Sequence, residues 1–191
     1  SWFPFRKTIP CVVHAGLAKC AACAHLRRCD RISAVNTTST YPQERIYATV
    51  ITFNPDLKRL RDNLRAVSGQ VAGVFVVDNG SRDVQAVRDV AAEMAGCTVV
   101  ENGQNLGVAA ALNRGVRAAR DAGAVAVLLL DEDSTSAPGM VRTLARHLGE
   151  DVGLVCPLIG NYLEGDALET SDVVCQVPRA INSGSLVSIA A

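Results

Sequence analysis

Apolar positions along residues 45–157 follow two alternating patterns. Short continuous apolar runs predict buried strands, at 46–52, 71–77, 97–100, 124–130 and 152–157. Between these runs, apolar residues recur every three or four positions and predict amphipathic helices, over 55–67, 84–94, 108–119 and 140–148. Strands that alternate with helices in this way are typical of an α/β fold with a mostly parallel sheet and helices on both faces.

The first predicted helix has a start signal in its sequence. Asn54 suits the N-cap position, Pro55 suits the first helical position, and Asp56 is favoured there by the helix dipole. The residues of this helix expected to face the core are Leu57, Leu60, Leu64 and Val67. Those of the third predicted helix are Val108, Leu112, Val116 and Ala119.

Polar residues follow the predicted strands at the point where each strand ends. Crossover connections between parallel strands are right-handed, so all these ends should lie on one edge of the sheet. In open α/β sheets this carboxyl edge is where ligands bind. The residues expected to converge there are Thr52, Phe53, Asn54, Asp78, Asn79, Asn105, Asp131, Glu132 and Asp133.

The last of these ends carries three consecutive carboxylates, Asp131, Glu132 and Asp133, directly after the apolar run 124–130. Two oxygen ligands one residue apart, on a rigid strand end, suit Mg²⁺ or Mn²⁺ beside a phosphate. The same triplet also fits an acidic loop in which Asp133 or Ser134 caps the next helix. The other polar strand ends favour the metal hypothesis.

Composition excludes some partners. The 191 residues contain 19 Lys plus Arg and 19 Asp plus Glu, so the chain has no net charge that would attract nucleic acid. No signal-peptide pattern occurs, and no apolar run is long enough to span a membrane. Because the chain begins with Ser and ends in an apolar run, we expect it to be a fragment.

Residues 1–44 differ from the rest and are interpreted as an N-terminal extension and linker, appended or poorly ordered, before a domain over 45–191. Their Cys20-x-x-Cys23 pair has the spacing of half a zinc site, but a second half with regular spacing is missing. Further candidate zinc ligands nearby are Cys11, His14, His25 and Cys29.

The remaining cysteines, Cys97, Cys156 and Cys175, lie in apolar contexts. We interpret them as small core residues of a reduced cytosolic protein, and not as parts of a disulfide framework.

Several segments match a known family in order and separation: 48–55 (ATVITFNP), 76–81 (VVDNGS), 105–115 (NLGVAAALNRG), 129–134 (LLDEDS) and 183–186 (SGSL). Through them residues 47–191 resemble the family 2 inverting glycosyltransferases, most closely the bacterial rhamnosyltransferases. The resemblance implies the glycosyltransferase A fold and a nucleotide-sugar donor, dTDP-rhamnose. It also implies a glycan or lipid-linked acceptor of the cell envelope, and peripheral association with the inner face of the membrane.

The resemblance assigns roles to individual residues. It implies donor-nucleotide contacts at Thr52, Phe53, Asn54, Asp78, Asn79, Asn105, Gly107 and Asp131. Among these, Asp78 would bind the base and Asp131 would lie near the ribose. Asn113 and Gly115 follow in the next helix, where close helix packing is the alternative explanation.

The resemblance places Asp133 on the metal, together with Asp131, and places Gly184 and Ser185 on the acceptor side. Glu132 stands where this branch often has Gln, which adds a negative charge. The metal, Mg²⁺ or Mn²⁺, would neutralise the leaving nucleoside diphosphate.

An inverting enzyme also needs a general base for the acceptor hydroxyl. In the family this base is an Asp that follows a Gly-rich turn further along the chain. Asp166, Glu169 and Asp172 are available acids, but none matches that position. We therefore name no base and expect the chain to bind donor and metal but to transfer little sugar.

Two alternatives stay open. The run 128–135 also fits the haloacid-dehalogenase phosphatases, with Asp131 as nucleophile and Asp133 as acid/base, but that family needs a downstream Lys and none follows Lys58. A non-catalytic nucleotide-binding fragment is the second alternative.

Overall fold

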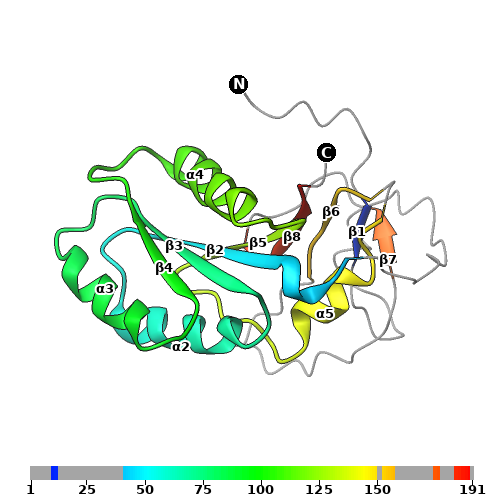
Figure 1. Cartoon of the computed structure of the whole chain (residues 1–191), viewed down its shortest axis with the longest axis horizontal. Helices are drawn as coiled ribbons and strands as arrows, with labels where there is room; N and C mark the ends of the chain where they lie inside the picture. The colour runs from blue at the N-terminus through cyan, green and yellow to red at the C-terminus, as the bar shows by residue number, and fades with distance from the viewer. Residues whose placement is uncertain (1–9, 13–40, 150–151, 158–173, 177–182, 190–191) are drawn as a thin grey trace, which may run out of the picture.

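The structure is a computed structural model that describes residues 10–12, 41–149, 152–157, 174–176 and 183–189. Its centre is a six-stranded sheet of order β4-β3-β2-β5-β8-β6 (Figure 1). The strands are β2 (Ile46–Thr52), β3 (Gly73–Asp78), β4 (Cys97–Glu101), β5 (Ala126–Asp131), β6 (Leu154–Val155) and β8 (Ser185–Ser188). Pairing is parallel from β4 to β5, whereas β8 is antiparallel to both of its neighbours. The predicted mostly parallel sheet is confirmed.

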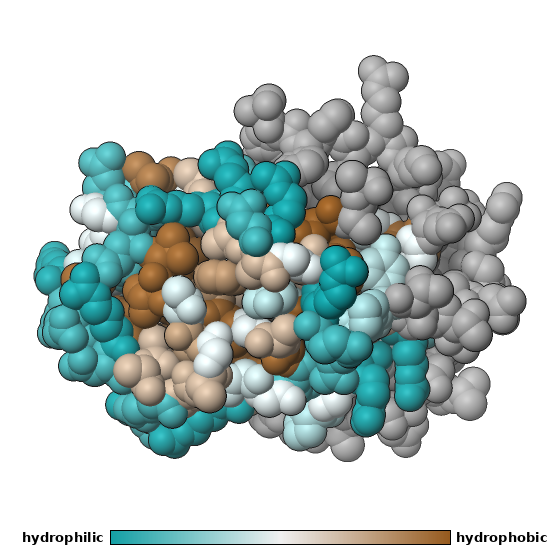
Figure 2. Space-filling view, viewed as in Figure 1, coloured by the Kyte–Doolittle hydropathy of each residue, from teal (hydrophilic) through white to brown (hydrophobic). Residues whose placement is uncertain are grey.

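Helices cover both faces of this sheet. Figure 1 shows α4 (Val108–Asp121) on one face and α2 (Leu57–Ser68), α3 (Val84–Ala92) and α5 (Met140–Ala145) on the other. A short 3₁₀ helix, η1 (Gln43–Arg45), precedes β2, and β1 (Pro10–Val12) pairs antiparallel with β7 (Val174–Gln176) in a separate small sheet. Strand β4 forms one edge of the sheet. Figure 2 shows that the surface on this side is polar over the helices and apolar between them.

The core between the sheet and α2 is aliphatic, as the sequence periodicity predicts. Leu60, Leu64 and Val67 of α2 are all fully buried, but Leu57 is 36% exposed. The helix begins two residues later than expected, because Asp56 is the N-cap and accepts hydrogen bonds from the amides of Lys58 and Arg59. The predicted cap at Asn54 is therefore wrong.

Helix α4 buries a stripe of small residues, Ala111, Gly115 and Ala119. The predicted inward face was wrong at its start, since Val108 is 53% exposed. The reason is close packing on β2: a Cβ atom on Gly115 would lie 2.3 Å from Thr49 Cγ2. Close helix packing is thus the structural explanation for Gly115.

The cysteines behave differently from one another. Cys97 is a partly buried free thiol whose pKa is raised by burial. Cys156 is 4% exposed, so its predicted place in the core is confirmed, but it is disulfide-bonded, so its interpretation as a reduced cysteine is wrong. It directly follows β6. The candidate zinc residues His14, Cys20, Cys23, His25 and Cys29 lie outside the described residues.

Gly115→Ala tests the close contact between α4 and β2. We expect the free energy of unfolding to fall by about 1–3 kcal/mol through overpacking, although alanine is the better helix former. The cause is the approach of the new methyl group to Thr49. Urea unfolding followed by circular dichroism measures the change.

Adding Thr49→Ala to Gly115→Ala removes Cγ2 and Oγ1, the two atoms that the new methyl group meets most closely, and should restore most of the lost stability. Thr49→Ala alone is the matched control. A Gly115→Ala protein as stable as the unmodified chain would show that α4 does not pack this closely on β2.

Candidate functional site

The carboxyl ends of the parallel strands lie side by side at one edge of the sheet. Thr52 of β2 pairs with Asp78 of β3, and Ile51 pairs with Asp131 of β5. On the far side of β3, Asp78 pairs with Glu101 of β4. The predicted convergence of these strand ends is therefore found in the structure.

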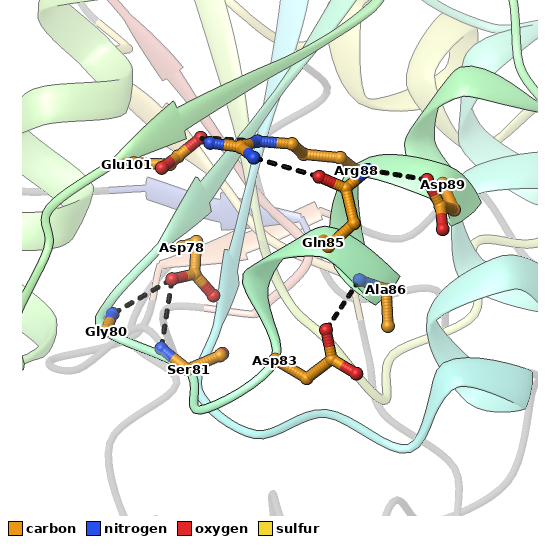
Figure 3. A network of polar contacts seen from close by, with 9 residues as sticks. All are labelled: Asp78, Gly80, Ser81, Asp83, Gln85, Ala86, Arg88, Asp89 and Glu101. Carbon is orange, nitrogen blue, oxygen red and sulfur yellow. Dashed lines mark hydrogen bonds and ion pairs between the residues drawn. The ribbon is translucent and has the colours of Figure 1, made fainter.

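Asp78 organises the turn after β3 (Figure 3). Asp78 is 1% exposed, and its Oδ2 atom accepts hydrogen bonds from the amides of Gly80 at 3.1 Å and Ser81 at 3.0 Å. Thr52 Oγ1 donates to the other oxygen, Oδ1, at 3.2 Å. A buried carboxylate is tolerated when it is bonded in this way. Most of the acceptor capacity of Asp78 is therefore used within the protein.

Asn54 links the end of β2 to this same turn. Its backbone has a φ of 52°, in the left-handed region that Asn tolerates better than most residues. Its amide donates to Ser81 Oγ at 2.8 Å, and its Oδ1 atom accepts from the amide of Arg82 at 2.9 Å. The Asn54 side chain therefore braces the turn, which explains why it does not cap α2.

A network of asparagine amides fixes the loop after β4. Asn79 is 3% exposed; its Nδ2 donates to Asn105 Oδ1 at 3.0 Å, and its Oδ1 accepts from Asn102 Nδ2 and the amide of Leu106. Asn105 Oδ1 also accepts from the amide of Gly107. The side chain of Asn79 thus positions the loop, while Asn105 and Gly107 are exposed at the site.

Gly107 itself has a φ of 82°, and an added Cβ there would meet nothing within 4 Å. Its glycine is required by the backbone conformation and not by crowding. The open space beside it leaves the backbone accessible at the entrance to α4.

The backbone around Asp131 is fixed from two other segments. The Asp131 amide donates to Ser183 Oγ at 3.2 Å, and the Asp131 carbonyl accepts from Asn63 Nδ2 at 2.7 Å. Ser183 also shares a hydrogen bond with Ser134 Oγ. Neither Asn63 nor Ser183 was predicted from the sequence as a site residue. A signal for Asn63 existed, because it is a polar residue on the otherwise apolar face of α2.

The Asn63 amide is only half satisfied. The residue is fully buried, yet its Oδ1 atom has no hydrogen-bond partner in the described part of the chain. Leaving such a buried acceptor unpaired costs about 1–3 kcal/mol.

Glu132 and Asp133 differ in what their carboxylates do. Glu132 Oε2 accepts a hydrogen bond from the amide of Phe53 at 2.8 Å, so it joins β5 to the end of β2. Phe53 itself is 45% exposed. Asp131 and Asp133 are both exposed residues at the sheet edge. This pair therefore remains available to a ligand.

Negative charge accumulates in this turn. The pKa of Asp131 is raised by burial and by the charge of Asp133, against the lowering effect of a hydrogen bond from Ser183. The pKa of Glu132 is raised mainly by burial and further by Asp133, Asp131 and Asp78, although the Phe53 amide lowers it. None of the ion pairs found in the described residues involves this triplet.

These residues fit a divalent cation that arrives with a substrate. Within the described ranges, no three His, Cys, Asp or Glu side chains gather closely enough to hold a metal ion by themselves. Mg²⁺, however, is usually held by one or two carboxylates together with water and substrate phosphates. Asp131 and Asp133 supply that number. A cation between them would relieve the repulsion from Asp133, which adds to the effect of burial in raising the pKa of Asp131.

Gly184 and Ser185 lie inside the protein, beside β5. The amide of Gly184 donates to the Leu129 carbonyl at 2.7 Å, and an added Cβ would lie 2.8 Å from Pro157 Cγ. Ser185 is 1% exposed and pairs with Leu129. Both residues have a packing role here, and their acceptor-side role stays a prediction.

The other predicted residues are placed as follows. Asn113 is exposed on α4, while Asp166, Glu169 and Asp172 lie outside the described residues.

In the described part of the chain, no helix combines the length and the apolar character that crossing a membrane requires.

Asp131→Asn tests the electrostatic cost of the acidic turn. Since the folded state raises the pKa of Asp131, the ionised carboxylate destabilises the metal-free protein above that pKa, and the penalty disappears as the pH falls toward the unfolded value. Asp131→Asn should therefore raise Tm by about 1–2 °C at pH 7, with a smaller gain in acid. Differential scanning fluorimetry across pH measures this.

Glu44→Gln, an exposed change in η1, is the control and should not alter the shape of the pH profile. A Tm for Asp131→Asn that lies several degrees below that of the unmodified chain at pH 7 would contradict the electrostatic account.

The family described as Glycosyl transferase family 2 matches residues 48–180. The dTDP-rhamnosyl transferase RfbF of Shigella flexneri is 30% identical over 106 residues, which are 56% of this chain and 35% of that protein. This chain thus spans about a third of the length of the curated relative it matches.

A solved structure described as "Crystal Structure of a Mycobacterial Protein" is 26% identical, with a TM-score of 0.46. It covers 63% of this chain, and the match covers 42% of that protein. The family match, at 48–180, includes the strand ends from β2, β3, β4 and β5 that form the candidate site.

Proposed function

Because the chain belongs to glycosyl transferase family 2, we propose that it binds a nucleotide-diphospho-sugar donor at the carboxyl edge of its sheet, for glycosyl transfer to an acceptor hydroxyl. The observation that carries this proposal is the exposed carboxylate pair Asp131 and Asp133, which lies level with the ends of β2 and β3. The name of the Shigella flexneri relative supports dTDP-rhamnose as the donor.

The nucleoside half of the donor occupies the loops after β2, β3 and β4. Phe53 is 45% exposed there and offers an aromatic surface to the base. Asn105 and Gly107 border the same region, with open space beside Gly107 through which a ligand reaches the backbone. Asp78 and Asn79 act mainly through the loops that they hold.

The diphosphate half lies over the acidic turn. Asp131 and Asp133 would hold Mg²⁺ or Mn²⁺, which when bound neutralises the charge that develops on the leaving nucleoside diphosphate. Glu132 binds the Phe53 amide and thereby joins the metal side of the site to the base side.

The acceptor is proposed from family resemblance alone, as a glycan or lipid-linked saccharide at the inner face of the membrane. Inversion requires that its hydroxyl attack the anomeric carbon from the face opposite the leaving group, with a general base to take the proton. We assign no residue to that base.

Calorimetric titration tests the donor site. We expect dTDP and dTDP-rhamnose to bind the chain in the presence of Mn²⁺, and Asp133→Ala to weaken this binding about 10-fold or more through loss of a metal ligand. UDP is titrated in parallel to compare donors. Glu44→Gln is the matched control for an exposed acid outside the site.

A folded chain that binds neither nucleotide, with or without Mn²⁺, would contradict the donor site. A preference for UDP would keep the site and replace the proposed sugar donor. Hydrolysis of a generic phosphomonoester that depends on Asp131 would favour the haloacid-dehalogenase alternative.

A further inference from the structure

Asn63 is a polar residue in a position where the fold calls for an apolar one. It is fully buried on the inner face of α2, and so are Leu60, Leu64 and Val67 on the same face. A helix that covers a sheet normally keeps this stripe apolar. An amide side chain here needs a reason other than packing.

Its hydrogen bonds indicate that reason. Asn63 Nδ2 donates to the Asp131 carbonyl at 2.7 Å, across a sequence separation of 68 residues. Asn63 Oδ1 finds no partner in the described residues, so the amide as a whole is poorly suited to stabilising the fold. Local features that cost stability are commonly retained where function requires them.

The carbonyl that Asn63 holds controls the direction of the acidic turn. This carbonyl belongs to the peptide plane that joins Asp131 to Glu132, and it also accepts from the Ser134 amide at 3.3 Å. The preceding peptide plane is held through the Asp131 amide by Ser183. Both peptide planes that flank Asp131 are therefore held, and the bond from the Ser134 amide closes the turn in which Asp133 lies.

We propose that Asn63 is a positioning residue for the donor site: it fixes the peptide after Asp131 so that the carboxylates of Asp131 and Asp133 face a shared cation. This role rests on the proposed function, because the value of the fixed geometry is cation and donor binding. Asn63 acts through its hydrogen bond to the Asp131 carbonyl, and it does not itself contact the nucleotide-sugar donor.

The test uses two substitutions. Asn63→Leu keeps the branched shape of the side chain and removes the hydrogen-bond donor Nδ2, and Asn63→Ala is too small to clash with the surrounding core. Amide hydrogen exchange of the metal-free protein, resolved by NMR, reports directly on the turn. We expect the Ser134 amide to exchange about 10-fold faster or more in both variants. Its acceptor is the Asp131 carbonyl, which is no longer held in place once the bond from Asn63 is lost. The Tm of Asn63→Leu should equal or exceed that of the unmodified chain.

Calorimetry with Mn²⁺ and dTDP provides the functional readout. Loss of a group that orients a metal ligand typically weakens metal binding 10- to 100-fold, so we expect a Kd for Mn²⁺ raised about 10-fold. Val67→Ala is the matched control: it truncates a buried residue on the same helix face that has no bond to Asp131. It should lower Tm and leave both the Ser134 exchange rate and the Mn²⁺ affinity unchanged.

The outcomes separate this inference from the proposed function. Unchanged Ser134 exchange in folded Asn63→Leu and Asn63→Ala overturns the positioning role, and so does an equal effect of Val67→Ala. If the unmodified chain binds neither Mn²⁺ nor dTDP, the proposed function fails, and the positioning of the turn is still decided by the exchange rates.

Discussion

The parallel pairing of β2 with β3 on one side and β5 on the other is the constraint on which the rest of the structure depends. This register puts Thr52 beside Asp78 and Ile51 beside Asp131, so that loops far apart in sequence meet at one edge. Helix α4 packs closely on β2 from one face through the contact between Gly115 and Thr49. From the other face, Asn63 of α2 donates a hydrogen bond to the end of β5. The sheet with helices on both faces is the glycosyltransferase A arrangement expected of the family.

Polar side chains, and not regular secondary structure, give the loops at this edge their shape. Asp78 binds the amides of its own turn, and Asn79 binds the loop after β4, which leaves buried polar groups satisfied where the backbone pattern ends. The acidic turn is different, because burial and neighbouring negative charge raise the pKa of Asp131 and of Glu132, and neither residue has a basic partner in the described ion pairs.

Sequence pattern predicted the parts of the fold that depend on local periodicity. The bounds of β2 and the buried face of α2 after Leu57 follow from strand and helix periods, and topology rules placed Asp78 and Asp131 at one edge. The pattern did not predict features that depend on contacts between distant parts of the chain. Asn54 accepts a hydrogen bond from the turn after β3 and does not cap α2, and the close approach of α4 to β2 requires small residues on α4. The antiparallel position of β8, the disulfide at Cys156 and the bond from Asn63 likewise depend on segments distant in sequence.

The central claim is that the loops after four parallel strands form one donor site around a single cation. Line broadening by Mn²⁺ in the presence of dTDP, read from the amide NMR signals of the chain, tests it most directly, because a paramagnetic ion broadens signals of nearby residues. The account predicts that the strongest broadening falls at 131–134 and extends to the loops at 52–54, 79–81 and 105–107. Broadening centred on another part of the chain, or spread evenly over its surface acids, would contradict it.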